Sequence, residues 1–223
     1  MAPAVRVSPS LLACDFTRMA EELRRVEEAG ADWHHVDVMD GHFVDNLTIG
    51  PPVVAKIKER ATIPLDVHLM IEEPARWAAR YADAGANVLT FHYEAAEDAF
   101  PETIEAFRRT GAKVGVAVNP DCGVKPLRPH LDALDLVLVM SVYAGFGGQK
   151  FLPAALDKVR ALRDWGFAGD VEIDGGVTGA NAGDCIEAGC SVLVAGTFVF
   201  RAPDIGQAIQ ALRTGAGTLQ ADA

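Results

Sequence analysis

The segment WHHVDVM, residues 33–39, alternates polar and apolar side chains in the middle of a β-rich stretch. Such alternation is typical of a strand whose two faces have different neighbours. His35, Asp37 and Met39 share one face of this strand, and His34 points to the other, because successive side chains point in opposite directions. We therefore predict a strand that carries an imidazole and a carboxylate toward its C-terminal end.

Similar short runs recur along the chain, and longer helical patterns separate them. The predicted strands are Val5–Ser10, Trp33–Val38, Leu65–Met70, Val88–His92, Lys113–Val118, Leu136–Ser141, Val171–Asp174 and Val192–Ala195. The clearest helical stretches are Thr17–Ala29, Pro51–Arg60, Pro74–Ala84, Pro153–Trp165 and Gly179–Ala188. Eight β-then-α units in 223 residues predict a single α/β domain over residues 1–223, a (β/α)8 or TIM barrel. Its active site is expected at the C-terminal ends of the strands.

An open, doubly wound sheet is the alternative architecture for such a pattern. No G-x-G-x-x-G motif opens the first unit, which weakens a dinucleotide-binding interpretation. The number of units favours the closed barrel. The low-complexity stretch 214–223 is expected to fray.

The chain has 31 acidic and 20 basic residues and a formal net charge of −11. Nucleic acid and anionic membranes are poor candidate partners for it, because both need a basic face. The beginning of the chain lacks the apolar core of a signal peptide, and no run approaches the roughly 18 apolar residues of a membrane span. We therefore expect a cytoplasmic protein. The four cysteines form no C-x-x-C pair and are expected to be free thiols.

Four polar residues stand at or near predicted strand ends, namely His35, Asp37, His68 and Asp174. Two imidazoles and two carboxylates that converge from three strands can bind a divalent metal ion. Taken singly, each histidine could be a core residue with its hydrogen bonds satisfied, and each aspartate a loop anchor or helix cap. Together, two buried carboxylates without a counter-charge would be costly. The spacing therefore favours a metal site.

Glycine-rich turns follow three successive predicted strands. They are Gly145-Phe146-Gly147-Gly148, Gly175-Gly176 after Asp174, and Gly196-Thr197. Any one of them could be only a tight turn. Three in succession favour a phosphate cradle made of backbone N–H groups, since glycine lets the main chain approach an anion closely. An acidic chain could bind an anionic substrate in this way.

These motifs resemble the ribulose-phosphate 3-epimerase family, and the resemblance covers residues 5–210. The matching blocks include SPSLL at 8–12, HVDVMDGHFV at 35–44, LDVHLM at 65–70, MSV at 140–142, GFGGQ at 145–149 and EIDGG at 172–176. The second and fifth of these blocks are the most specific. The resemblance implies an isomerase of the pentose phosphate pathway that interconverts ribulose 5-phosphate and xylulose 5-phosphate by inverting C3 through an enediolate.

The resemblance also implies roles for individual residues. Asp37 and Asp174 would be the catalytic acid and base, and with His35 and His68 they would ligate one divalent metal ion: Zn, Fe(II), Mn or Co. The residues implied to bind the sugar phosphate are Ser10, His35, His68, Gly145, Phe146, Gly147, Gly148, Asp174, Gly175, Gly176, Gly196 and Thr197. Met39, Met70 and Met140 would form a mostly apolar wall, residues 143–149 a flexible lid, and the protein a homo-oligomer.

The chain departs from the family pattern at some positions, and these leave alternatives open. Tyr143 and Ala144 replace a smaller or polar residue and a proline in the lid, so a six-carbon ketose phosphate such as allulose 6-phosphate is an alternative substrate. A hexulose-phosphate type lyase or synthase would share the phosphate turns but would not need Asp174. A barrel that only binds a ligand, without catalysis, would not need the intact ligand set.

Overall fold

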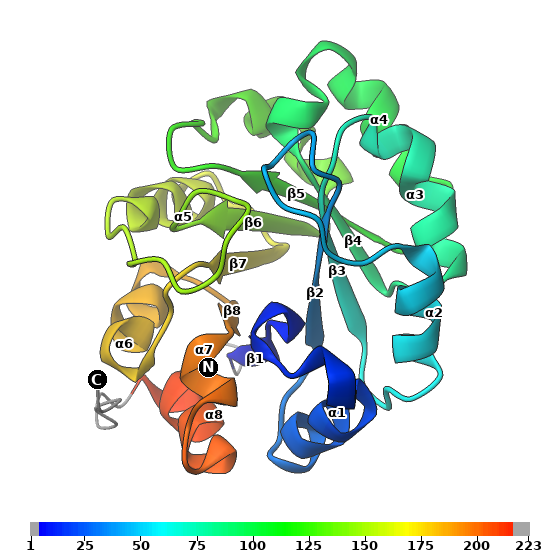
Figure 1. Ribbon diagram of the computed structural model, residues 1–223. Coiled ribbons are helices and arrows are strands. Elements are labelled where there is room, and N and C mark those ends of the chain that lie inside the picture. Colours follow the sequence, from blue (N-terminus) through cyan, green and yellow to red (C-terminus); the bar gives the residue numbers. More distant parts are fainter. Residues whose placement is uncertain (1–4, 216–223) are drawn as a thin grey trace.

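Eight parallel strands form the centre of the structure, a computed structural model that describes residues 5–215. They are β1 (Arg6–Pro9), β2 (His34–Met39), β3 (Leu65–Met70), β4 (Val88–His92), β5 (Lys113–Val118), β6 (Leu136–Met140), β7 (Asp170–Asp174) and β8 (Val192–Ala195). The sheet order is β1-β8-β7-β6-β5-β4-β3-β2. A parallel bridge between Ser10 and His35 joins its two ends, so the sheet closes into the predicted barrel (Figure 1).

Helices surround the barrel (Figure 1). They are α1 (Met19–Glu28), α2 (Pro51–Lys58), α3 (Pro74–Asp83), α4 (Phe100–Arg108), α5 (Ala155–Asp164), α6 (Gly179–Ala188), α7 (Thr197–Phe200) and α8 (Ile205–Thr214). Short 3-10 helices span Leu11–Ala13, Phe16–Arg18, Tyr93–Ala95, Glu97–Ala99 and Lys125–Ala133. The five predicted helices are all present, with bounds that differ by at most two residues at either end.

The crossover from β5 to β6 departs from the predicted β-then-α alternation. It contains the 3-10 helix Lys125–Ala133 instead of an α-helix. Pro126 lies in its first turn and Pro129 inside it. Proline has no N–H to donate and its ring clashes with the preceding turn, so it disfavours a continuous α-helix. Pro153, expected in the first turn of a helix, instead lies in the turn that precedes α5.

Helix α6 shows how the local sequence sets the bounds of an element. Thr178 accepts a hydrogen bond from the backbone at the start of the helix, and the Asn181 side chain accepts one from the Thr178 N–H. This reciprocal pair satisfies N–H groups that the first helical turn leaves unpaired. Gly189 ends the helix with a φ of 111°, a conformation that favours glycine. The glycines after β7 are thereby held at the start of a well-capped helix.

The two faces of the strands pack in two different apolar regions, one outside the barrel and one inside it. Their outward faces pack against the helices in one large apolar core. Inside the barrel, a second apolar cluster includes Trp33, Leu136 and Val192. The β2 alternation is as predicted, because His34 lies outward with its Nε2 2.8 Å from a Glu27 oxygen of α1, whereas His35 faces the other buried side chains of the site. The polar residues of β2 therefore reach the barrel interior.

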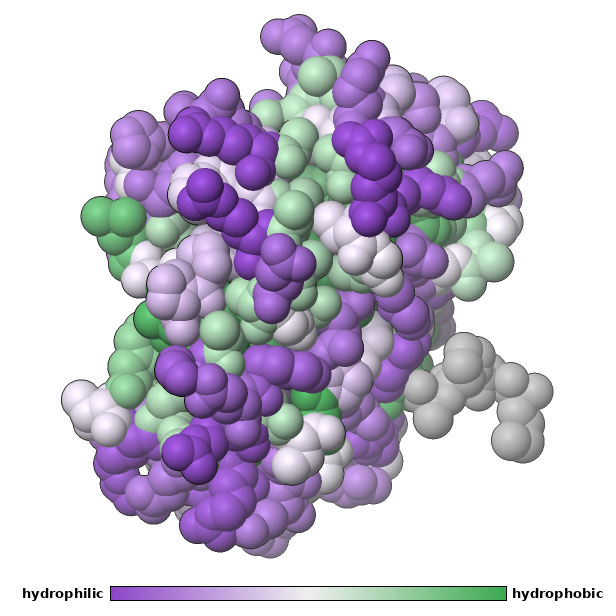
Figure 2. Space-filling model, turned by 90° about the vertical axis from the view of Figure 1, so that its right-hand side faces the viewer, coloured by the Kyte–Doolittle hydropathy of each residue, from purple (hydrophilic) through white to green (hydrophobic). Residues whose placement is uncertain are grey.

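The end of the described chain differs in part from the expected frayed tail. Thr214 is the last residue of α8, and Gly215 follows it with a φ of 64°. The remainder of the predicted tail, residues 216–223, lies outside the described residues. Within residues 5–215, all four cysteines are free and no helix has the length and apolarity required to cross a membrane. The face shown in Figure 2 is mostly hydrophilic, with small apolar patches.

Candidate active site and metal centre

The register of β2 and β3 brings the predicted ligand set together. His35 is opposite Asp66 and Asp37 is opposite His68 in this parallel pair. Asp174 is the last residue of β7. One ligand atom from each of His35, Asp37, His68 and Asp174 lies within 4.8 Å of all the others. The four residues that the spacing singled out therefore form one cluster.

The distances within the cluster suit a small cation. The His35 Nε2 atom is 3.3 Å from His68 Nδ1 and 3.4 Å from an Asp37 oxygen. His68 Nδ1 is 3.7 Å from the same Asp37 oxygen, and His35 Nε2 is 3.9 Å from an Asp174 oxygen. Ligands at about 2.1 Å from a tetrahedral ion are about 3.4 Å apart. Nitrogen and carboxylate donors at these separations fit a divalent transition metal.

The orientation of His35 supports the same conclusion. Its Nδ1 atom is 2.6 Å from an Asp66 oxygen, and both side chains are fully buried. When Nδ1 carries the proton and donates it to Asp66, the lone pair of Nε2 faces the cluster. A carboxylate that orients a histidine in this way is a common partner of metal ligands.

Sequence reasoning did not assign a role to Asp66 or Glu172. Both residues occur in the sequence analysis only within motifs, Asp66 in LDVHLM and Glu172 in EIDGG. A Glu172 oxygen lies 3.8 Å from His35 Nδ1, and the side chain is fully buried. Burial and the nearby Asp66 raise the pKa of Glu172 well above its ordinary value, against the opposing effect of His35. Alternation along the strand could have indicated Glu172, because a residue two positions before Asp174 lies on the same face of the strand.

The two candidate catalytic carboxyls have opposite pKa shifts. Burial acts against the charged form of Asp37, but His35 and His68 outweigh it and hold the pKa of Asp37 well below its usual range. Burial raises the pKa of Asp174 to about 7, with Asp37 and Asp66 adding to the effect and His35 opposing it. Without a bound metal, Asp37 is therefore ionised at neutral pH and Asp174 is close to half protonated. Nearby opposite charges lower a carboxyl pKa, whereas burial and like charges raise it, so the two carboxyls shift in opposite directions.

A cavity of about 1360 Å³ opens beside this cluster at the C-terminal ends of the strands. The predicted residues that line it are Ser10, Asp37, Met39, Met70, Met140, Gly145, Phe146, Gly147, Gly148, Asp174, Gly175, Gly176, Gly196 and Thr197. Ser10 donates a hydrogen bond of 2.7 Å to Asp37. His35 and His68 are fully buried and are not among these lining residues. In this arrangement they are placed to bind a metal ion behind the carboxylates.

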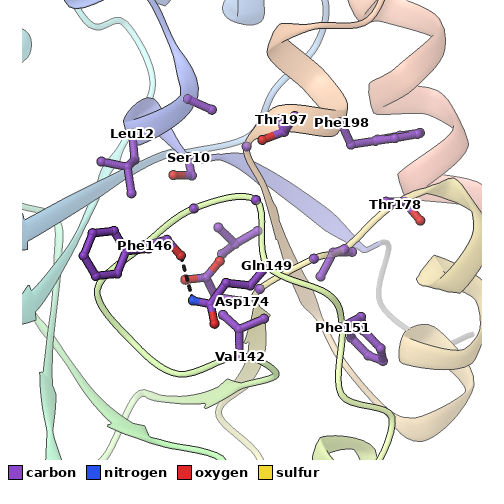
Figure 3. A pocket seen from close by; sticks show the side chains of 18 of the residues that line it. Ser10, Leu12, Val142, Phe146, Gln149, Phe151, Asp174, Thr178, Thr197 and Phe198 are labelled. Carbon is purple, nitrogen blue, oxygen red and sulfur yellow. Dashed lines mark hydrogen bonds between the residues drawn. The ribbon is translucent and has the colours of Figure 1, made fainter. Parts of the chain in front are cut away.

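The glycine-rich turns form the other side of the cavity (Figure 3). Gly176 has a φ of 63°, and a Cβ atom there would lie 2.6 Å from the Phe151 nitrogen and 2.7 Å from the Gln149 oxygen. Only glycine fits this position without displacing backbone. The turn after β7 is therefore packed directly against the chain that leaves the lid.

The segment predicted to form a lid, residues 143–149, is held in place by three side-chain hydrogen bonds. The Gln149 amide donates to the carbonyl oxygens of Tyr143 and Phe146, and Figure 3 shows the second of these bonds. Asn46, from the β2–α2 loop, donates to the Gly145 carbonyl at 2.8 Å. This segment thus contacts the loop that follows β2, the strand that carries the candidate ligands His35 and Asp37.

A solved structure of similar architecture comes from Streptococcus mutans. It is the crystal structure of a protein named KGPDC, and it matches with a TM-score of 0.72 over 97% of this chain and 99% of that chain. The identity is 15%, so this likeness concerns the fold alone.

Two curated relatives are much closer in sequence, and both are named ribulose-phosphate 3-epimerase. The protein from Mycobacterium tuberculosis (strain H37Rv) is 50% identical over 218 residues, which cover 95% of this chain and 93% of the relative. The protein from Bacillus subtilis is 44% identical over 214 residues, which cover 94% and 98%. The model of the ribulose-phosphate 3 epimerase family matches residues 6–200. The matched region contains every candidate site residue, and the chain belongs to the ribulose-phosphate 3-epimerase family.

Proposed function

We propose that this chain is an isomerase that interconverts D-ribulose 5-phosphate and D-xylulose 5-phosphate by inverting C3. The observation that carries the proposal is the pair Asp37 and Asp174, which come from β2 and β7 and line the same cavity. A relative with the corresponding name is 50% identical to the chain over nearly its full length. A two-carboxylate site suits this reaction, since inversion requires proton transfer on both faces of one carbon.

The chemistry follows from the position of C3 next to a ketone. Its proton can leave to give a planar enediolate. One of Asp37 and Asp174 removes the proton from one face, and the other returns a proton to the opposite face. The two residues exchange these roles in the reverse direction. Ser10, hydrogen-bonded to Asp37, is placed to contact both this carboxylate and the substrate.

His35, Asp37, His68 and Asp174 would hold one divalent metal ion. When bound, such an ion stabilises negative charge that develops on substrate oxygens. The donor set suits Zn, Fe(II), Mn and Co alike. Met39, Met70 and Met140 would surround the enediolate with an apolar, polarizable wall.

The phosphate would bind at Gly175-Gly176, at Gly196-Thr197 and beneath the lid residues 145–148. Backbone N–H groups there can neutralise the anion without lysine or arginine. The lid would close over the enediolate and keep water from it. Asn46 and Gln149 hold the lid in the arrangement described above.

The decisive assay combines turnover with isotope incorporation. Purified protein should convert ribulose 5-phosphate to xylulose 5-phosphate, and in deuterated water the product should carry deuterium at C3. Absence of label at C3 would contradict proton abstraction there. Parallel turnover of allulose 6-phosphate tests the six-carbon alternative, which faster conversion of that substrate would favour.

We also propose a single barrel domain over residues 1–223, a homo-oligomer and a cytoplasmic location. Phe16 and Val53, with exposed fractions of 47% and 42%, line one surface pocket beside α1 and α2, and this apolar patch supports association between copies of the chain. Light scattering during size-exclusion chromatography measures the oligomeric state directly. A single mass equal to one chain at micromolar concentration would contradict the homo-oligomer.

A further inference from the structure

The metal-ligand candidate His68 is in contact with a second buried histidine that the reaction described above does not use. His92, at the end of β4, lies with its Nε2 atom 2.9 Å from His68 Nε2. Its Nδ1 atom is 3.5 Å from a Glu94 oxygen. We propose that Glu94, acting through His92, is a positioning residue that fixes the tautomer of His68. This inference rests on the proposed metal site.

A hydrogen bond between two neutral imidazoles allows two proton arrangements. One ring must supply an N–H and the other a lone pair. In the first arrangement, His68 donates from Nε2 to His92, and the lone pair of His68 Nδ1 faces Asp37 and His35. In the second, His92 donates to His68, which then carries its proton on Nδ1. Only the first arrangement leaves His68 able to ligate a metal through Nδ1.

Two side chains compete to select between these arrangements, because both face His92 Nδ1. The Glu94 oxygen can only accept a hydrogen bond from it, which requires an N–H at Nδ1 and gives the first arrangement. The Asn119 Nδ2 atom, 3.4 Å away, can only donate, which gives the second. The Asn119 amide is oriented with Nδ2 toward His92 because its oxygen accepts the Ala144 N–H at 3.1 Å.

The unsatisfied oxygen of Glu94 decides in favour of the first arrangement. One Glu94 oxygen accepts the Asn119 backbone N–H at 2.7 Å. The other is buried and, within residues 5–215, has no hydrogen-bond donor that meets strict geometry. The nearby N–H of His92 is therefore the group that can compensate this buried charge. A hydrogen bond from His92 to the charged Glu94 oxygen is stronger than one from the neutral Asn119 amide to His92.

The two metal-ligand histidines thus receive their tautomers by different routes. Asp66 contacts His35 directly at 2.6 Å. Glu94 contacts His68 only through His92, and the same glutamate holds the Asn119 backbone at the base of the lid. Carboxylates that orient metal-ligating histidines typically matter by about 10–100-fold in metal affinity.

The test uses Co2+ binding by the full chain, followed by visible absorption. Glu94→Gln keeps the shape and the acceptor for the Asn119 N–H, but it presents an NH2 group to His92 Nδ1 and so favours the second arrangement. We expect its Co2+ affinity to fall by about 10–100-fold, with an altered absorption spectrum. Glu97→Gln is the matched control, because Glu97 is exposed on the adjacent 3-10 helix, and it should bind Co2+ as the unaltered chain does.

A rescue variant separates the tautomer effect from damage to the fold. In Glu94→Gln/Asn119→Asp, the new carboxylate accepts the Ala144 N–H with one oxygen and the His92 N–H with the other. Co2+ affinity should then recover by at least about tenfold relative to Glu94→Gln. Metal-free thermal unfolding of each variant reports the fold independently of metal.

Each result has a distinct meaning. Equal Co2+ affinity in Glu94→Gln and the unaltered chain would overturn the role of Glu94. An affinity loss without recovery in the double variant would assign the effect to charge or packing and would also overturn the tautomer argument. Failure of the unaltered chain itself to bind Co2+ would instead overturn the proposed metal site.

Discussion

The two sides of the cavity are built by different means. On the side of β2 and β3, side chains carried by buried strands supply the chemistry, and strand register sets the spacing of Asp37 and His68. On the side of β6 to β8, loops supply mostly backbone, and Gly145, Gly148 and Gly176 have positive φ angles. Asp174 joins the two sides, because it ends β7 and directly precedes Gly175-Gly176.

The difference teaches how an acidic chain with a net charge of −11 can handle an anionic sugar phosphate. In the proposed mechanism, the carboxylates that exchange protons lie on rigid strands, where a shift of about 1 Å would cost catalysis. Anion recognition in the proposed mechanism is left to main-chain N–H groups, which carry no formal charge. Substitutions on the strand side should therefore affect the chemical step, and substitutions on the loop side should affect substrate binding.

The largest loss of turnover should come from replacing either of the two candidate catalytic carboxyls. Asp37→Asn and Asp174→Asn should each lower turnover of ribulose 5-phosphate by at least about 10³-fold, because an amide cannot exchange the proton. Circular dichroism should show an unchanged fold. Asp45→Asn, an exposed site on the loop after β2, is the control and should keep its turnover. Near-full turnover in either of the first two variants would refute the two-base mechanism.

Metal removal should have the next largest effect. Prolonged treatment with a strong chelator should reduce turnover by at least about 10²-fold, since an uncompensated negative charge on the enediolate is costly. Added Zn2+, Mn2+ or Co2+ should restore it, and metal analysis should give about one ion per chain. If chelated protein that analysis shows to be free of metal retained full activity, the His35–His68 cluster would need a different role.

In the metal-free protein, the raised pKa of Asp174 should make the free energy of unfolding depend on pH. Because Asp174 has a pKa near 7 in the folded state and an ordinary value of 3.8, the folded state binds more protons between these values. Metal-free stability should therefore fall as pH rises from about 4 to about 7, by up to about 4 kcal/mol from this group. Asp174→Asn should weaken that dependence and raise the midpoint of thermal unfolding at pH 8. An unchanged pH dependence would contradict the raised pKa.

A substitution on the loop side should weaken substrate binding, and its effect should be smaller. Gly176→Ala places a methyl group 2.6 Å from the Phe151 nitrogen, so the turn must shift. We expect KM to rise by about tenfold, which corresponds to about 1.4 kcal/mol, while metal content stays the same. Gly123→Ala is the control, because nothing lies within 4 Å of its Cβ position and its φ is not positive. A large loss of bound metal in Gly176→Ala would show that the two sides are not separable.

The sequence predicted the features that local patterns encode. Alternation placed His35 and Asp37 on one face of β2 and His34 on the other, and all eight strands lie where the β-rich runs predicted them. Helix α6 has the predicted bounds because its capping residues are its immediate neighbours in sequence. The crossover after β5 differed from the predicted α-helix because two prolines disfavour one there. These prolines are a local signal, but the regular β-then-α pattern of the other units suggested a helix.

Contacts between distant strands could not be read in this way. The sequence by itself determined the strand positions, the side-chain alternation and the glycine turns, because these depend on neighbouring residues. Only the tertiary structure decided that Asp66 and Glu172 approach His35, and that Glu94 reaches His68 through His92. Such contacts depend on strand register and on burial. Burial raises the pKa of Glu172, and it leaves one oxygen of Glu94, among residues 5–215, with His92 Nδ1 at 3.5 Å but no hydrogen bond of good geometry. Both arise only when the barrel closes.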